Sequence, residues 1–133
     1  MSGKTPRRAA RSPRRKGGTA TLRSLTKRIL AFRDARDWKR FHTPKDMALS
    51  LCLEAAEVLE WMQWKNGADL DAHLAKRRRE VGEELSDVLY WVLLLAHDLD
   101  IDLSTAFRRK MAVNARKYPV RASKGTATKY SDR

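Results

Sequence analysis

Apolar residues recur three or four positions apart in four stretches of this chain, a spacing that predicts α-helices and leaves no convincing β-strand pattern. The helices that we expect cover residues 21–38, 44–64, 69–96 and 102–118. Pro44 suits the first turn of the second helix, and Asn66-Gly67 suits the stop that follows it. The pattern therefore predicts an all-α four-helix bundle.

Two pairs of acidic residues interrupt the apolar faces of the second and third expected helices. Glu54 and Glu57 are three residues apart, and Glu84 and Asp87 repeat this spacing. An α-helix turns by about 100° per residue, so each pair directs two carboxylates toward one face. In both helices the first carboxylate lies within the apolar face and the second lies at its edge, about 60° away. If the two helices pack antiparallel, all four carboxylates converge.

Converging carboxylates repel one another strongly in a poorly solvated site, so we expect a cation to neutralise them. Ligation by carboxylate oxygens alone favours a hard divalent ion, Mg²⁺ or Mn²⁺. Acidic pairs at this spacing also occur on solvated helix faces, and this alternative stays open. The sequence excludes a di-iron helical bundle, because none of its three histidines lies three residues after a glutamate. It also contains no glycine-rich phosphate loop of the GxxxxGK[ST] type.

The net charge of +13 over 133 residues at first suggests a nucleic-acid ligand. More than half of that excess lies in residues 1–20, which are rich in Pro, Gly, Ser and Ala and contain no acid. We expect residues 1–20 to be a disordered basic tail that contacts nucleic acid only non-specifically, if at all. No apolar run approaches the ~20 residues of a membrane span, and one cysteine suits a reducing compartment. We therefore expect a cytoplasmic protein without a membrane partner.

Several motifs, found in order along the chain, resemble those of the MazG-like all-α NTP pyrophosphohydrolases, and in particular the dCTP pyrophosphatase branch. The Glu54-x-x-Glu57 and Glu84-x-x-Asp87 pairs resemble the metal motif of this family. The other stretches similar to the branch are ARDWKRFHTP at 35–44, MQW at 62–64, EELSDVL at 83–89, KMAVNARKYP at 110–119 and SKGTATKYSD at 123–132.

The resemblance implies that residues 21–119 form a domain that hydrolyses the α–β phosphoanhydride of a nucleoside triphosphate to the monophosphate and pyrophosphate. It implies a preference for dCTP or a modified dCTP, Mg²⁺ bound by the four carboxylates, and catalysis in which Glu57 orients or deprotonates water. It also implies a homo-oligomer, a tetramer or a dimer, with sites near subunit interfaces. Residues 120–133 are expected to be a basic tail or a loop over the site.

Four aromatic residues are candidates to bind the base. Trp38 and His42 lie in the motif shared with the branch, although Trp38 equally suits a hydrophobic helix cap. Trp64 follows Glu57 by two helical turns and therefore lies on the same face, where it can stack on a base. Trp91 follows the second acidic pair by one turn and suits either the core or the pocket wall.

The candidates to meet phosphate or sugar are polar residues after the second helix and toward the C-terminus: Lys65, Lys110, Asn114, Tyr118, Lys124 and Lys129. Three of them are spaced four residues apart on one face of the fourth helix, which equally suits a solvated face. Two other functions remain open. A helical nucleic-acid-binding module would use residues 1–20 and the basic run Lys76–Arg79, and a helical interaction protein would need no catalysis.

Overall fold

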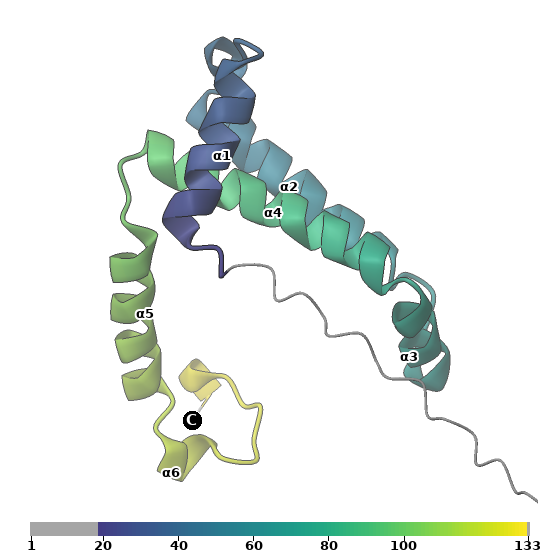
Figure 1. The fold of residues 1–133 in the computed structure, drawn as a ribbon. Coiled ribbons are helices and arrows are strands. Elements are labelled where there is room, and N and C mark those ends of the chain that lie inside the picture. Colours follow the sequence, from purple (N-terminus) through teal and green to yellow (C-terminus); the bar gives the residue numbers. More distant parts are fainter. Residues whose placement is uncertain (1–18, 133) are drawn as a thin grey trace, which may run out of the picture.

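The computed structural model describes residues 19–132 (Figure 1). Over this range it contains six α-helices and two short 3-10 helices and no β-strand, so the predicted all-α class is confirmed. Among the described residues, no helix combines the length and apolar character that crossing a membrane requires. The predicted disordered tail, residues 1–20, lies outside the described residues except for its last two.

The first two α-helices begin at threonine caps. α1, Leu22–Asp34, follows Thr21, and α2, Pro44–Glu60, follows Thr43. In both cases the threonine side chain accepts a hydrogen bond from a backbone N–H of the first turn, which would otherwise lack a helical partner. A 3-10 turn, η1 at Lys39–Phe41, lies in the connection between them. The second helix therefore begins at Pro44, as the sequence predicts.

α2 packs antiparallel along α4, Arg78–Asp98, and α1 crosses the C-terminal half of α4 (Figure 1). The buried apolar side chains are Met47 on α2 and Leu93, Leu94 and Ala96 on α4. The core therefore lies where α1, α2 and the end of α4 meet. The other half of the α2/α4 pair is more polar and carries the acidic residues.

A buried ion pair joins the C-terminal ends of α1 and α4. The guanidinium of Arg33 donates two hydrogen bonds, of 2.7 and 3.1 Å, to the carboxylate of Asp98. Burial by itself would raise the pKa of Asp98, but the hydrogen bonds and charge interactions with Arg33 and His97 together outweigh it and hold this pKa below its ordinary value. The pair fixes the position of α1 over the end of α4.

The prediction of four helices is wrong, because the expected third helix is divided in two. α3, Gly67–Lys76, ends at Arg77, and α4 begins at the next residue. Arg77 has φ −109° and ψ 19°, which lies outside the α-helical region, and its N–H donates to carbonyls of the preceding turn. The turn sets α3 at an angle to α4, and the ring of His73 stacks on that of Trp61 with centroids 6.2 Å apart. The hydrophobic pattern of the sequence does not predict this contact, because it joins two different helices.

α5, Leu103–Lys117, leads away from the α2/α4 pair (Figure 1). Two of its large apolar side chains are exposed: Phe107 by 67% and Met111 by 50%. The chain then forms a short α6, Val120–Ser123, and a 3-10 turn, η2 at Tyr130–Asp132. An exposed apolar helix face of this kind is typical of a surface that binds another protein surface.

Candidate active site

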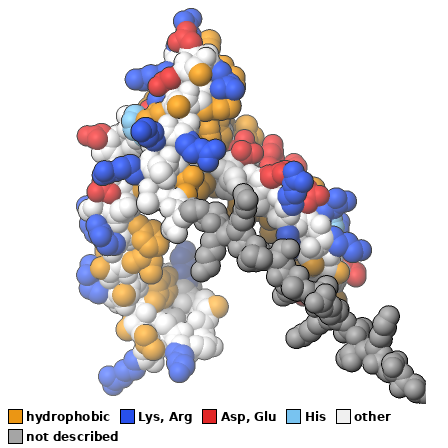
Figure 2. Space-filling view, viewed as in Figure 1, with side chains coloured by type: hydrophobic (Ala, Val, Ile, Leu, Met, Phe, Trp, Pro, Cys, Tyr) orange, Lys and Arg blue, Asp and Glu red, His pale blue; other side chains and the backbone are white. Residues whose placement is uncertain are grey.

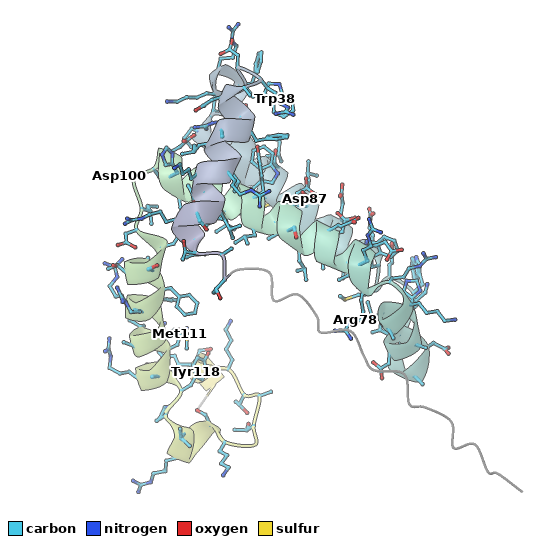
Figure 3. All side chains as sticks on the ribbon, viewed as in Figure 1. Trp38, Arg78, Asp87, Asp100, Met111 and Tyr118 are labelled. Atoms are coloured by element: carbon cyan, nitrogen blue, oxygen red, sulfur yellow. The ribbon has the colours of Figure 1, made fainter. Side chains whose placement is uncertain are left out.

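Acidic side chains gather along the α2/α4 pair, as Figure 2 shows. Glu54 on α2 and Glu84 and Asp87 on α4 each offer one carboxylate oxygen, and these three oxygens all lie within 4.8 Å of one another. Glu54 and Glu84 are half-buried, whereas Asp87, labelled in Figure 3, is exposed. The spacing of one turn on α4 and the antiparallel packing of α2 account for this convergence.

Glu57 lies beside these three carboxylates, one turn after Glu54. Its pKa is raised above the ordinary value, mainly by the hydrogen bond that its side chain shares with Glu84, and further by the negative charge of Glu54. A carboxyl group holds its proton more tightly when neighbouring carboxylates repel its charged form. The structure thus brings the four predicted acidic residues together, and we call Glu54, Glu57, Glu84 and Asp87 the carboxylate cluster.

A cavity of about 700 Å³ adjoins the carboxylate cluster. Glu54 and Asp87 form part of its wall, and the predicted residues Trp38, His42 and Trp91 form another part. The remaining lining comes mainly from α1 and α4, and we call this space the aromatic cavity. Acidic ligands and aromatic surfaces therefore face the same space.

Edge-to-face ring contacts build the wall of the aromatic cavity. The ring of Phe32 lies 5.7 Å from that of Trp38 and 6.3 Å from that of Tyr90, between centroids. Tyr90 in turn lies 5.0 Å from Trp91, and Trp91 lies 5.3 Å from His42. Because aromatic pairs favour this geometry, the contacts hold the rings in place without any ligand.

His42 stands at one end of this series of rings. Burial is the main cause that lowers its pKa; the positive charge of Arg33 lowers it further, and Asp98 acts in the opposite sense. Its Nδ1 atom is buried and has no hydrogen-bond partner among the described residues. The imidazole is therefore neutral at pH 7, and it can donate one hydrogen bond and accept another.

The sequence profile of the MazG-like family matches residues 49–132, a span that contains the whole carboxylate cluster. The chain belongs to the MazG-like family. The family and the enzyme class predicted from the sequence, a pyrophosphatase, are thereby confirmed.

Curated and solved MazG-like relatives cover most of the chain. dCTP pyrophosphatase 1 of Rattus norvegicus is 40% identical over 114 residues, which are 84% of this chain and 67% of the rat protein. The Homo sapiens protein of the same name is 33% identical over 114 residues, with the same two shares, 84% and 67%. The crystal structure of a pyrophosphatase from Archaeoglobus fulgidus is 38% identical, with a TM-score of 0.71 over 80% of this chain and 99% of that one.

Several residues predicted to bind substrate lie outside the aromatic cavity of a single MazG-like chain. Trp64 is 90% exposed and has φ 64°, a conformation that bulky side chains rarely adopt. Lys110, Asn114 and Tyr118 lie on α5 or at its end, and Figure 3 shows Tyr118 well separated in space from Asp87 on α4. The remaining residues outside the cavity are Lys65, Lys124 and Lys129.

Sequence reasoning missed four residues of the site. Arg28 and Phe32 line the aromatic cavity from α1, and Tyr90 lines it from α4. Arg28 lies four residues before Phe32 and therefore beside an apolar helix face. This position was the sequence signal that could have identified Arg28 as a site residue. Trp61 donates a hydrogen bond from Nε1 to Oε1 of Glu84, at 3.4 Å. No sequence signal marks that contact, because it joins two helices.

The alternative nucleic-acid-binding function depends in part on the basic run Lys76–Arg79. Neighbouring acidic residues neutralise part of its charge. Arg77 pairs with Glu80 at 3.0 Å, and Arg79 pairs with Glu83 at 3.1 Å. Arginines paired in this way attract phosphate groups less strongly than their number in the sequence suggests. The described residues therefore give the nucleic-acid function no support beyond net charge.

Proposed function

We propose that this MazG-like chain hydrolyses a nucleoside triphosphate to the monophosphate and pyrophosphate, with dCTP or a modified dCTP preferred. The observation that carries the proposal is the junction of the carboxylate cluster with the aromatic cavity, because Glu54 and Asp87 belong to both. The cluster suits a cation with the triphosphate, and the cavity suits a base. The relatives named dCTP pyrophosphatase 1 support this choice of substrate.

The carboxylate cluster fits a hard divalent cation. Its donors are carboxylate oxygens, three of them within 4.8 Å of one another, and Mg²⁺ and Mn²⁺ accept such ligands. The raised pKa of Glu57 supports this fit: it comes mainly from the hydrogen bond shared with Glu84 and further from the charge of Glu54, and a cation would relieve that charge repulsion. The proposed cofactor is Mg²⁺, with Mn²⁺ as a substitute. When bound, it would supply positive charge that offsets the negative charge developing on the phosphate oxygens.

The four carboxylates have different surroundings and therefore different proposed roles. All four would hold the cation, and the half-buried Glu54 and Glu84 would be the more rigid ligands. Glu57 is exposed at the edge of the cluster, so water can approach its oxygens. Glu57 would orient the attacking water or take its proton.

The base would enter the aromatic cavity beside the carboxylate cluster. Trp38 and Trp91 offer ring surfaces for packing or stacking, and these are already held by neighbouring rings. The neutral imidazole of His42 can hydrogen-bond to the donor and acceptor groups along the edge of a cytosine. Arg28, in the same wall, would add a positive charge for phosphate oxygens.

The remaining predicted residues would reach the substrate from a second copy of the chain, in a dimer or tetramer. The exposed apolar residues of α5, Phe107 and Met111, support such assembly, because a partner would bury them. If a second copy of the chain packed against α5, Lys110, Asn114 and Tyr118 would lie close to the triphosphate bound by that copy. The exposed and unusual conformation of Trp64 supports a contact of the same kind. Lys65, Lys124 and residues 120–133 would close over the site in the assembly.

The test measures pyrophosphate release from a panel of nucleoside triphosphates by purified protein. Release should require Mg²⁺ or Mn²⁺, stop with EDTA and return when the metal is restored. Glu84→Gln and Asp87→Asn should each lower kcat/KM for dCTP by at least about 100-fold, the loss expected when a metal site is damaged. Glu60→Gln, an exposed glutamate one turn after Glu57, is the matched control and should keep full activity. Wild-type activity in both site variants would exclude the carboxylate cluster.

The proposed compartment is the cytoplasm, in line with the single cysteine of the chain. Cys52 is free and exposed on α2. An exposed free thiol persists most readily in a reducing compartment. Fractionation of cells that express the chain tests this placement, and recovery with a secreted or membrane fraction would contradict it.

A further inference from the structure

The indole of Trp61 reaches from the end of α2 to the carboxylate cluster. Trp61 is half-buried and directly follows Glu60, the last residue of α2. Its Nε1–H donates a hydrogen bond of 3.4 Å to Oε1 of Glu84, which belongs to α4. An indole N–H is a donor only, and a partly buried one usually finds an acceptor. The acceptor here is a member of the carboxylate cluster.

Two neighbouring residues, His73 and Arg77, contact the indole ring and restrict its orientation. The ring of His73, on α3, is stacked on it with centroids 6.2 Å apart and planes 29° apart. The guanidinium of Arg77 lies 6.0 Å from the indole centroid, close enough for a cation–π contact. Arg77 donates its own hydrogen bond to Glu80 rather than to the cluster. α3 and the turn residue that follows it thus supply the two supports of Trp61.

Among the members of the carboxylate cluster, Glu84 is the one that an uncharged hydrogen-bond donor would help most. Its side chain shares a hydrogen bond with Glu57, and it lies within 4.8 Å of Glu54 and Asp87 through one oxygen of each. A cationic partner would compete with a bound metal for the same carboxylate. An indole N–H instead restricts the rotation of the carboxylate and leaves its negative charge available to the metal.

We propose that Trp61 is a positioning residue for Glu84: its N–H orients this carboxylate for the divalent cation, and α3 and Arg77 hold the indole in place. The proposal rests on the metal site of the proposed function. Trp61 touches neither substrate nor metal, and its effect passes through Glu84. The competing explanation is that Trp61 only anchors α3 through its ring.

The two explanations predict opposite rankings for two variants. Trp61→Phe keeps an aromatic ring against His73 and removes the N–H. Trp61→Gln keeps an N–H donor and removes the ring. If the N–H positions Glu84, the phenylalanine variant loses more metal affinity, whereas if the ring only anchors α3, the glutamine variant loses more. Thermal unfolding of the metal-free proteins reports the structural role separately.

The experiment titrates Mn²⁺ into metal-free protein by isothermal titration calorimetry, with wild type and Glu84→Gln as the intact and damaged sites. We expect Trp61→Phe to bind Mn²⁺ about five- to tenfold more weakly, near the lower end for outer-shell substitutions because the hydrogen bond is long. Its thermal midpoint without metal should equal that of the wild type. The Mg²⁺ concentration for half-maximal hydrolysis should rise by the same factor, with kcat unchanged at saturating Mg²⁺. Trp61→Gln should bind Mn²⁺ more tightly than Trp61→Phe.

Wild-type Mn²⁺ affinity in Trp61→Phe overturns the inference, and so does a Trp61→Gln protein that binds more weakly than Trp61→Phe. If Glu84→Gln abolishes the binding seen in wild type, either result leaves the proposed metal site intact. If wild-type protein binds no Mn²⁺, the proposed metal site fails and this inference fails with it.

Discussion

Replacing Asp98 with asparagine removes one charge of the buried ion pair and leaves the guanidinium of Arg33 without a counter-ion. The side chain of Arg33 is only 2% exposed and that of Asp98 13%, so water cannot replace the lost carboxylate. Removing one partner of a buried pair costs about 3–5 kcal/mol. Asparagine keeps one oxygen for the arginine N–H groups, so we expect the lower end, about 3 kcal/mol.

The control is Asp37→Asn, which removes the partner of Arg40 in an ion pair whose side chains are both more than half exposed. An exposed pair contributes less than about 1 kcal/mol, so this variant should unfold nearly as the wild type does. Asp37 has φ 51°, but asparagine tolerates this conformation as aspartate does, so the backbone adds no difference. The two variants therefore differ in the burial of the arginine that loses its partner.

The assay is urea unfolding at one fixed protein concentration, because assembly would otherwise shift the apparent stability. Urea unfolding gives the free energy of unfolding directly. Thermal unfolding of the same variants provides a second readout, because for a domain of this size a loss of about 3 kcal/mol corresponds to a fall of roughly 12 °C in the thermal midpoint. The folded-state pKa of Asp98 is depressed, so its stabilisation is full at neutral pH and disappears as the pH falls below about 4 through that pKa. Equal stability of the two variants at pH 7 would refute the reasoning, as would a difference that persists at low pH.

Three further predictions concern the site and the assembly. Trp38→Ala should raise KM for dCTP about tenfold with a smaller change in kcat, since stacking on a base contributes about 1–3 kcal/mol, and steady-state kinetics checks it. Glu57→Gln should lower kcat by more than it lowers Mn²⁺ affinity, measured by calorimetry; the reverse order would make Glu57 mainly a ligand. Phe107→Asp should dissociate the proposed oligomer in sedimentation velocity, because it places a charge in the proposed interface, and an unchanged sedimentation coefficient would remove α5 from that interface.

The residues whose partners lie on periodic helix faces could be predicted from the sequence. Glu54 and Glu84 share the phase of apolar neighbours on α2 and α4, and antiparallel packing of two such faces brings their carboxylates together. Trp38 and His42 could be proposed because they lie in a motif that resembles a family. In these cases the information is local to one helix or one short segment.

The contacts that join distant segments could not be predicted. Arg33 and Asp98 are 65 residues apart, and nothing in the sequence distinguishes this arginine from the other basic residues of the chain. The break at Arg77 interrupts an otherwise helical pattern, and Trp61 finds Glu84 only once two helices have packed. Phe107 and Met111 of α5 fit a helix pattern, but the pattern does not reveal that a single chain leaves them exposed.

The carboxylate cluster and the aromatic cavity are proposed to form one site for α–β cleavage of a nucleoside triphosphate. The most direct measurement is product analysis of dCTP incubated with the purified full chain and Mg²⁺. We expect dCMP and pyrophosphate in equal amounts, and neither product in EDTA or with Asp87→Asn. Formation of dCDP and phosphate, or no cleavage of any nucleoside triphosphate with Mg²⁺ or Mn²⁺, would contradict it.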